Sequence, residues 1–319
     1  MRTLTISAIA MAGTLLLAGC GGDPAPQQRA AEAPAQGGTG GGAGALNTTI
    51  GTAKTSKAQP GTGDWAAPNG GNLRAVDVEK ADNWVQLTAA RAGALDPVLV
   101  NGAGLTLYRF DEDSADPPTA TCNGECATTW PPVTVEADGK IFIAGVAEEK
   151  VGVVRRDDGR LQVTVGGWPV YRFAKDTEAG DTKGQGVKGT WFGITPDGGK
   201  AGEAEAPAEE DPAEQSAQTP AGSAKRVVLF GGRNFNVFDD AASSQVIEAG
   251  SAPDGGCVNA IDAKTASSIA FDGLVKVWDG PDCTGESQEL GAVNAEFVGG
   301  IADLRDIDFD NRIASVKIG

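Results

Sequence analysis

The sequence predicts a mainly β protein composed of two small β-rich segments. Residues 105–110 follow a period of two along the chain, which is typical of a strand, and residues 170–173 repeat the pattern. Residues 225–319 contain short apolar runs separated by Gly-Gly and Asp-Gly turns, as in a β-sandwich or barrel. Little helix is expected beyond one turn over residues 122–130.

The remaining strands are expected where short apolar runs lie between turn residues. In the first segment they cover residues 84–88, 151–155, 161–165 and 190–194. In the second segment they cover residues 227–230, 268–271, 275–278 and 314–318.

The N-terminus has the composition of an export signal. Arg2 is followed by an apolar stretch over residues 4–17, which is shorter than the about 20 apolar residues of a membrane span. The stretch ends in Leu17-Ala18-Gly19-Cys20, which resembles the lipobox of bacterial lipoproteins. This resemblance implies removal of residues 1–19 and lipidation of Cys20. The lipid would hold the protein on the extracytoplasmic face of the cell membrane or outer membrane.

Composition divides the rest of the chain. Residues 20–78 are rich in Gly, Ala, Pro, Gln and Thr and lack hydrophobic periodicity, so we expect a flexible, lipid-anchored tether. Residues 197–224 are rich in Ala, Glu and Pro and are expected to form an acidic linker. Two globular domains are therefore expected, over residues 79–196 and 225–319.

The first domain contains an internal duplication with the pattern Tyr-x-Phe-x-x-Asp. Its two copies consist of Tyr108, Phe110 and Asp113, and of Tyr171, Phe173 and Asp176. The Tyr and Phe of each copy share one face of a strand, and the Asp follows at the strand end. We interpret the aromatic residues as core rather than as a stacking surface for glycan, quinone or peptide. The aspartates are interpreted as acceptors of turn N–H groups rather than as a glycosidase pair.

The cysteines indicate an oxidising compartment. Without Cys20, four remain, and each domain holds one pair: Cys122 with Cys126, and Cys257 with Cys283. We expect two structural disulfides. The alternative for Cys122 and Cys126 is an exported redox pair, which the surrounding acidic residues disfavour because they oppose a thiolate.

Composition also excludes several functions. The chain has 43 acidic and 26 basic residues, a net charge of −17, so no nucleic-acid partner is expected. The absence of histidine excludes Ser-His-Asp and Cys-His catalysis and histidine-ligated metals. No nucleotide-binding glycine motif is visible. We expect no enzyme activity and no cofactor apart from the Ca²⁺ considered below.

Residues 100–196 resemble the "secreted repeat of unknown function" lipoproteins. The resemblance rests on the two Tyr-x-Phe-x-x-Asp copies, on Cys122-x-x-x-Cys126 with the following Trp130-Pro131-Pro132, and on the glycine-rich segment 180–186 before Trp191. It implies an exported and often lipid-anchored protein, and it implies no particular activity.

Residues 225–319 resemble the βγ-crystallin superfamily, including small secreted peptidase inhibitors. Each half begins with a strand and an aromatic turn, at 228–235 and 277–285, and ends in an Ala-Ser-containing stretch. The resemblance implies a Greek-key sandwich and Ca²⁺ binding. Asp310 and Asn311 retain most of one Ca²⁺ motif, whereas Ala263 and Lys264 replace the acidic residues of the other.

The function expected from the sequence is that of a non-enzymatic exported lipoprotein. It would display binding or envelope-associated modules toward an unidentified extracytoplasmic ligand or protein. The alternatives are protease inhibition by the C-terminal domain, redox activity of Cys122 and Cys126, and weak Ca²⁺ binding by the crystallin-like domain.

Overall fold

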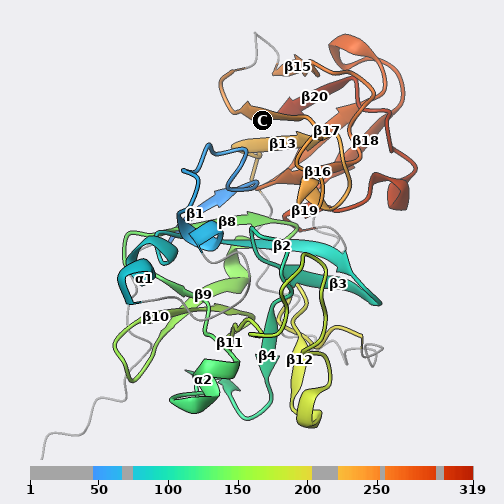
Figure 1. Ribbon diagram of the computed structural model, residues 1–319. Helices are drawn as coiled ribbons and strands as arrows, with labels where there is room; N and C mark the ends of the chain where they lie inside the picture. Colours follow the sequence, from blue (N-terminus) through green and yellow to red (C-terminus); the bar gives the residue numbers. More distant parts are fainter. Residues whose placement is uncertain (1–45, 67–74, 203–221, 252–255, 292–297, 319) are drawn as a thin grey trace, which may run out of the picture. The chain divides into compact units, whose positions relative to one another are not determined.

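The computed structural model describes residues 46–66, 75–202, 222–251, 256–291 and 298–318 (Figure 1). The fold of these residues is mainly β, as the sequence predicts, and the helical elements are short. None of the helices in the described ranges is long and apolar enough to cross a membrane. The export signal and Cys20 lie outside the described residues.

The first segment contains three small sheets and a short hairpin. One sheet has the order β1-β8-β2-β3, with β8 parallel to both of its neighbours. A second joins β9, β10, β11 and β7, and a third pairs β4 with β12. The elements are β1 (Asn47–Ile50), η1 (Gly63–Ala66), α1 (Ala75–Ala81), β2 (Trp84–Ala92), β3 (Leu95–Val100), β4 (Tyr108–Phe110), β5 (Ser114–Ala115), β6 (Pro118–Thr119), α2 (Glu125–Thr129), β7 (Thr134–Val135), β8 (Lys140–Ala144), η2 (Glu148–Lys150), β9 (Val151–Arg155), β10 (Leu161–Val165), β11 (Trp168–Pro169), η3 (Val187–Gly189) and β12 (Trp191–Gly193).

The second segment is a sandwich of two four-stranded antiparallel sheets. Their orders are β14-β13-β16-β19 and β15-β20-β17-β18. The third strand of each half therefore belongs to the sheet of the other half, which is the Greek-key exchange expected from the sequence. The elements are β13 (Arg226–Phe230), η5 (Asn234–Asn236), β14 (Ser244–Glu248), β15 (Cys257–Asn259), β16 (Ser268–Phe271), β17 (Val275–Trp278), η6 (Pro281–Cys283), β18 (Ser287–Leu290), β19 (Gly300–Ile301), η7 (Leu304–Ile307) and β20 (Ser315–Ile318).

The folded part begins earlier than the expected tether over residues 20–78 allows. β1 lies within that range and pairs along its whole length with β8, and its Ile50 is buried. Its sequence, Asn-Thr-Thr-Ile, is rich in β-branched residues, which suit an extended strand. Further along, Trp65 packs edge-on against Trp84 at 4.9 Å between ring centroids. The tether prediction is thus corrected for residues 46–66 and for residues 75–78, where α1 begins. The linker expected over residues 197–224 is corrected at both ends, because Ala201 and Ala224 are buried in hydrophobic clusters.

The described residues between 46 and 318 belong to one compact unit. The Arg91 backbone N–H donates to the Asn234 side chain at 3.1 Å, and the Gly145 N–H donates to the Gly299 carbonyl at the same distance. Phe235 of the second segment is fully buried in a hydrophobic cluster whose other members come mostly from the first segment. Because this cluster includes side chains of both segments, their stabilities are coupled in the intact chain.

Candidate functional site

The two Tyr-x-Phe copies meet at the centre of the first segment. The first copy is strand β4, whereas the strand expected over residues 170–173 is reduced to isolated bridges at Tyr171. Tyr108 and Tyr171 form an antiparallel bridge in which each backbone N–H donates to the carbonyl of the other at 2.9 Å. Equivalent residues of the two copies therefore lie opposite one another, as a local two-fold axis requires. Both tyrosine side chains are completely buried.

Each tyrosine donates a hydrogen bond to the aspartate of the other copy. The Tyr108 hydroxyl donates to Asp176 Oδ2 at 2.6 Å, and the Tyr171 hydroxyl donates to Asp113 Oδ2 at 2.7 Å. Burial is the main cause that raises the pKa of both phenols, and the neighbouring carboxylates add to it. The two copies of the motif are thus joined by reciprocal hydrogen bonds, from the tyrosine of each copy to the aspartate of the other.

The other oxygen of each aspartate accepts a backbone N–H from the following loop. Asp113 Oδ1 accepts the N–H of Thr121 at 2.7 Å, and Asp176 Oδ1 accepts that of Lys183 at 3.0 Å. The interpretation of these residues as acceptors of turn N–H groups is confirmed. Burial raises the pKa of both carboxyls, and the hydrogen bonds act against that rise. With both oxygens bonded inside the protein, neither is presented to a substrate.

Four aromatic rings form a continuous buried stack between the copies. Trp130 and Trp191 are parallel, with centroids 3.8 Å apart. Phe110 stacks on Trp191 at 4.1 Å, and Phe173 stacks on Trp130 at 4.2 Å. Each Phe therefore packs on the Trp of the opposite copy. These side chains form a closed core and not a surface for flat ligands.

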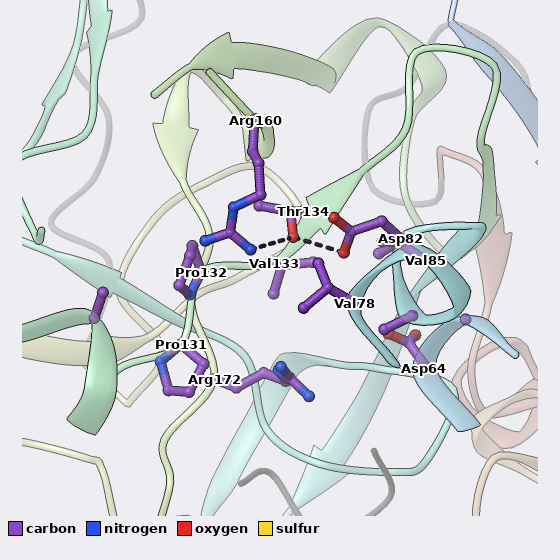
Figure 2. Close-up of a pocket in the computed structure, with 13 residues that line it drawn as sticks. Asp64, Val78, Asp82, Val85, Pro131, Pro132, Val133, Thr134, Arg160 and Arg172 are labelled. Carbon is purple, nitrogen blue, oxygen red and sulfur yellow. Dashed lines mark hydrogen bonds between the residues drawn. The ribbon is translucent and has the colours of Figure 1, made fainter. Parts of the chain in front are cut away.

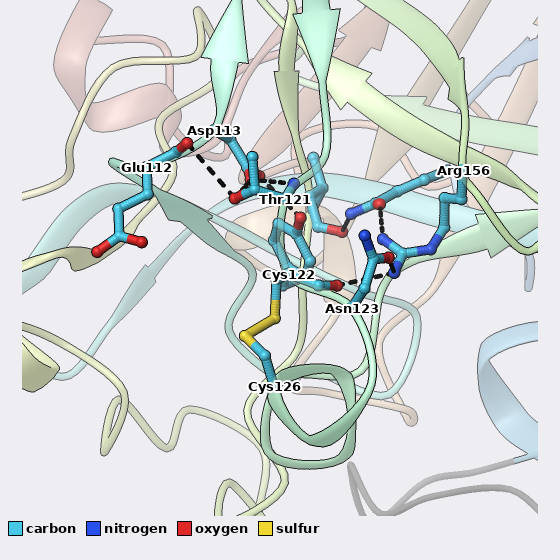
Figure 3. The surroundings of a disulfide bond; sticks show 10 residues. Glu112, Asp113, Thr121, Cys122, Asn123, Cys126 and Arg156 are labelled. Carbon is cyan, nitrogen blue, oxygen red and sulfur yellow. Dashed lines mark hydrogen bonds between the residues drawn. A yellow bond between two sulfur atoms is a disulfide. The ribbon is translucent and has the colours of Figure 1, made fainter.

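The Cys122–Cys126 disulfide belongs to the same hydrophobic cluster as this stack. Figure 3 shows the disulfide with Asn123 and Arg156 close to it. Cys122 is 1% exposed, and the bond joins the start of α2 to the loop before it. Arg156, which is distant from the disulfide in the sequence, lies close to it in the structure. Its guanidinium donates to the Cys122 carbonyl at 2.8 Å and to Asn123 Oδ1 at 2.7 Å. Arg156 bonds the backbone rather than the sulfur, so it fixes the loop that carries the disulfide.

The second disulfide, Cys257–Cys283, joins β15 to η6 in the sandwich. Asp310 and Asn311, the Ca²⁺ candidates, lie in the turn before β20, where the Asn311 side chain donates to Asp310 Oδ2 at 2.9 Å. Across the described part of the chain, no group of three or more His, Cys, Asp or Glu residues is arranged to hold a metal ion. The other oxygen of Asp310, Oδ1, is buried and has no hydrogen-bond partner among the described residues.

A polar cavity of about 330 Å³ opens in the first segment, between α1, η1 and the loop after α2 (Figure 2). Its apolar wall includes Val78, Val85, Pro131, Pro132 and Val133, and its polar residues are Asp64, Asp82, Thr134, Arg160 and Arg172. A volume of this size and a few convergent polar groups are typical of a small-molecule site.

The two aspartates of the cavity are held by hydrogen bonds on one oxygen each. Asp64 Oδ2 accepts the backbone N–H groups of Gln86 at 2.8 Å and Gly102 at 2.9 Å. Asp82 Oδ1 accepts the Thr134 hydroxyl at 2.8 Å. Burial raises the pKa of Asp64 to about 6 and also raises the pKa of Asp82. Both carboxylates are therefore costly to ionise and favour a cationic neighbour.

Arg172 is the unusual member of the cavity. The residue is 8% exposed, and its Nε has no hydrogen-bond partner in the part of the chain that the structure describes. Among the described residues it forms no side-chain hydrogen bond or ion pair, and only the longer-range field of Asp64 and Asp82 compensates its charge. Burial lowers the pKa of its guanidinium. None of Arg172, Asp64 and Asp82 is predicted from the sequence as a binding residue.

Comparison with known proteins gives a family match in the first segment. Residues 92–134 and 152–195 each match a family model described as a secreted repeat of unknown function. Each match contains one Tyr-x-Phe-x-x-Asp copy, and the description supports a location outside the cytoplasm. The search of curated proteins gave no match.

Several crystallin domains are among the solved structures similar to this chain. A βγ-crystallin from Ciona intestinalis is 19% identical, covering 30% of this chain and 99% of its own, with a TM-score of 0.22. A βγ-crystallin from an archaeon is 18% identical, covering 31% and 100%, with a TM-score of 0.23. The fifth crystallin domain of the non-lens protein Absent in melanoma 1 is 20% identical, covering 31% and 92%, with a TM-score of 0.23. The Greek-key assignment itself rests on the strand order described above.

Proposed function

We propose that this protein is an exported, lipid-anchored module that binds a small extracytoplasmic ligand and catalyses no reaction. The observation that carries the proposal is the polar cavity with Arg172 buried in its wall and without a hydrogen-bonding partner among the described residues. A buried guanidinium whose donors lack hydrogen-bond partners is unfavourable for folding alone, so a ligand that accepts from these donors would account for it.

Two further observations support a binding role over catalysis. The residues that resemble catalytic groups in the sequence are bonded within the core: Asp113 and Asp176 to the tyrosines, and Cys122 to Cys126. The secreted-repeat match agrees with export, and the Leu-Ala-Gly-Cys sequence ending at Cys20 supports a lipid anchor.

The anchor and the binding role are tested separately. For the anchor, the full-length protein and its Cys20→Ala variant are expressed in a bacterial host and separated by detergent phase partition. We expect the lipid mass on the wild-type chain only, with the variant in the aqueous phase. For binding, the mature chain is screened against a small-metabolite library by thermal shift. A wild-type chain without lipid contradicts the anchor, and a library without any stabilising compound contradicts the binding role.

Protease inhibition by the C-terminal domain is a second candidate, favoured by one surface residue. Ile261 is 80% exposed on the loop after β15, and its backbone N–H is fixed by the Gln245 side chain at 2.8 Å. An exposed apolar side chain on a held backbone suits insertion into a protease pocket. The mature chain and its Ile261→Glu variant are compared on a panel of secreted proteases. Unchanged activity with excess wild-type chain would remove this candidate.

A further inference from the structure

The duplicated motif supplies two arginines at equivalent positions, and they differ in their surroundings. Arg109, in the first copy, donates to the Gly198 carbonyl at 2.9 Å and lies 3.3 Å above the ring centroid of Trp168. It also forms an ion pair with Asp111 at 3.6 Å. The residue equivalent to Asp111 in the second copy is Ala174. The second arginine, Arg172, therefore lacks the acid that its counterpart uses.

The Arg172 side chain instead lines the cavity. Figure 2 shows its guanidinium beyond Pro131, pointing toward the side where Asp64 lies, with Asp82, Thr134 and Arg160 across the cavity. A guanidinium presents several N–H donors in a planar fork that matches a carboxylate with two parallel hydrogen bonds. At 8% exposure, such a fork is screened little by solvent and would bind a carboxylate strongly.

The charges around the cavity exclude a simple anion. Arg160 is held by Asp158, which it meets at 3.0 Å, so its charge is already compensated. Arg172 then faces two carboxylates, those of Asp64 and Asp82. A ligand with a carboxylate alone would add a third negative charge to a buried site. A ligand that also carries an ammonium adds no net charge and gives each of its charges an opposite partner.

We propose that this cavity binds a small zwitterion of the α-amino acid type, with its carboxylate on Arg172 and its ammonium toward Asp82. The inference rests on the proposed binding function and names its ligand class. Asp82 Oδ1 is engaged by Thr134, and no hydrogen bond among the described residues engages Oδ2, which can accept from the ammonium. The apolar wall of Val78, Val85 and Val133 suits a short aliphatic side chain.

The test is calorimetric titration of the mature chain with L-alanine and L-valine. Two analogues of valine dissect the recognition: isobutyrate lacks the ammonium, and isobutylamine lacks the carboxylate. We expect binding of at least one amino acid and at least tenfold weaker binding of both analogues, because each loses one charged contact. Isobutyrate that binds as tightly as valine would show a plain anion site and overturn the proposal.

Two variants and a matched control locate the site. Arg172→Gln is expected to weaken amino-acid binding at least tenfold. Asp82→Asn is expected to weaken amino-acid binding and to strengthen the weak binding of isobutyrate, because the variant removes one of the negative charges that oppose a carboxylate. Arg155→Gln removes the same charge from an exposed side chain on β9 and is expected to bind as the wild type does. Undiminished binding in Arg172→Gln overturns the assignment.

The library screen separates this inference from the proposed function. If both amino acids fail to bind the wild-type chain while another metabolite stabilises it, the ligand class is wrong and the binding function remains. If the amino acids and the library all fail, both proposals are contradicted.

Discussion

Tyr108 of the first copy donates its hydroxyl hydrogen bond to Asp176 of the second copy, across 68 positions of sequence. Replacing Tyr108 with Phe removes this donor from a buried carboxylate. We therefore expect the free energy of unfolding to fall by about 1–3 kcal/mol. Tyr171→Phe is expected to have a similar effect through Asp113. Urea unfolding of the mature chain measures both changes.

A double-mutant cycle tests the exchange between copies. Tyr108→Phe with Asp176→Asn is expected to show a coupling energy of about 0.5–3 kcal/mol, because the two groups share one hydrogen bond. Tyr108→Phe with Asp113→Asn is the control, and its effects are expected to add within about 0.5 kcal/mol. Stronger coupling in the control pair would contradict the exchanged arrangement.

Gly184 is expected to tolerate no side chain. A Cβ there would lie 2.7 Å from Cζ of Tyr108 and 3.0 Å from Trp130, and both rings are fixed in the core. Gly184→Ala is expected to destabilise the chain by about 1–3 kcal/mol. Gly222→Ala is the control, since a Cβ at Gly222 meets nothing within 4 Å, and its effect is expected to stay within about 0.5 kcal/mol. Equal midpoints in urea would disprove the crowding.

The stability of the protein is expected to depend on pH through Asp64. Its folded pKa is raised to about 6 from 3.8, so the folded state binds the proton more tightly than the unfolded state does. The contribution of Asp64 therefore increases stability as pH falls through 6 and reaches its full value below 3.8. The total is on the order of 2–3 kcal/mol.

The difference between wild type and Asp64→Asn isolates this contribution. Free energies of unfolding are measured at several values between about pH 4 and pH 7. The wild type is expected to gain stability relative to the variant as pH decreases. A constant difference in the free energy of unfolding across this range would show that Asp64 has the same pKa in the folded and unfolded states.

The Cys122–Cys126 bond is expected to be structural. Cys122 is buried against the aromatic cluster, so its sulfur is poorly accessible to a partner thiol. Thiol labelling across a redox series is expected to give a reduction potential below about −300 mV. A value within the range of catalytic dithiols, about −120 to −270 mV, would instead favour an exported redox role.

Ca²⁺ binding near Asp310 is expected to be weak, with a dissociation constant no lower than about 0.1 mM. Among the described residues no group of three or more His, Cys, Asp or Glu side chains is arranged to hold a metal, and Asp310 Oδ2 already accepts from Asn311. Calorimetric titration with Ca²⁺, compared with Asp310→Asn, measures the affinity. Binding tighter than this limit, lost in the variant, would contradict the expectation.

Much of the fold was predictable because its strands alternate within short windows. The predicted strands 151–155 and 161–165 coincide with β9 and β10, and those at 268–271 and 275–278 coincide with β16 and β17. β1 was missed because it is four residues long and lies in a Gly-rich region, and only pairing with the distant β8 fixes it.

The cavity could not be found from local patterns, because its residues come from separate elements and meet only in three dimensions. One signal was nevertheless present in the sequence. The duplicated copies are alike at Arg109 and Arg172, but Asp111 of the first is Ala174 in the second. Comparing the two copies position by position identifies Arg172 as an arginine without its usual partner.

The exchange of Tyr, Asp, Phe and Trp contacts also bears on the origin of the first segment. A single copy standing alone would leave a buried tyrosine and a buried aspartate without their partners, and its Phe without the Trp on which it stacks. Two identical copies could supply these groups to each other across a two-fold axis. The present chain thus has the internal geometry of a homodimer joined by gene fusion. In a fused chain the two halves can differ at equivalent positions, as they do at Asp111 and Ala174. Two identical subunits cannot differ in this way.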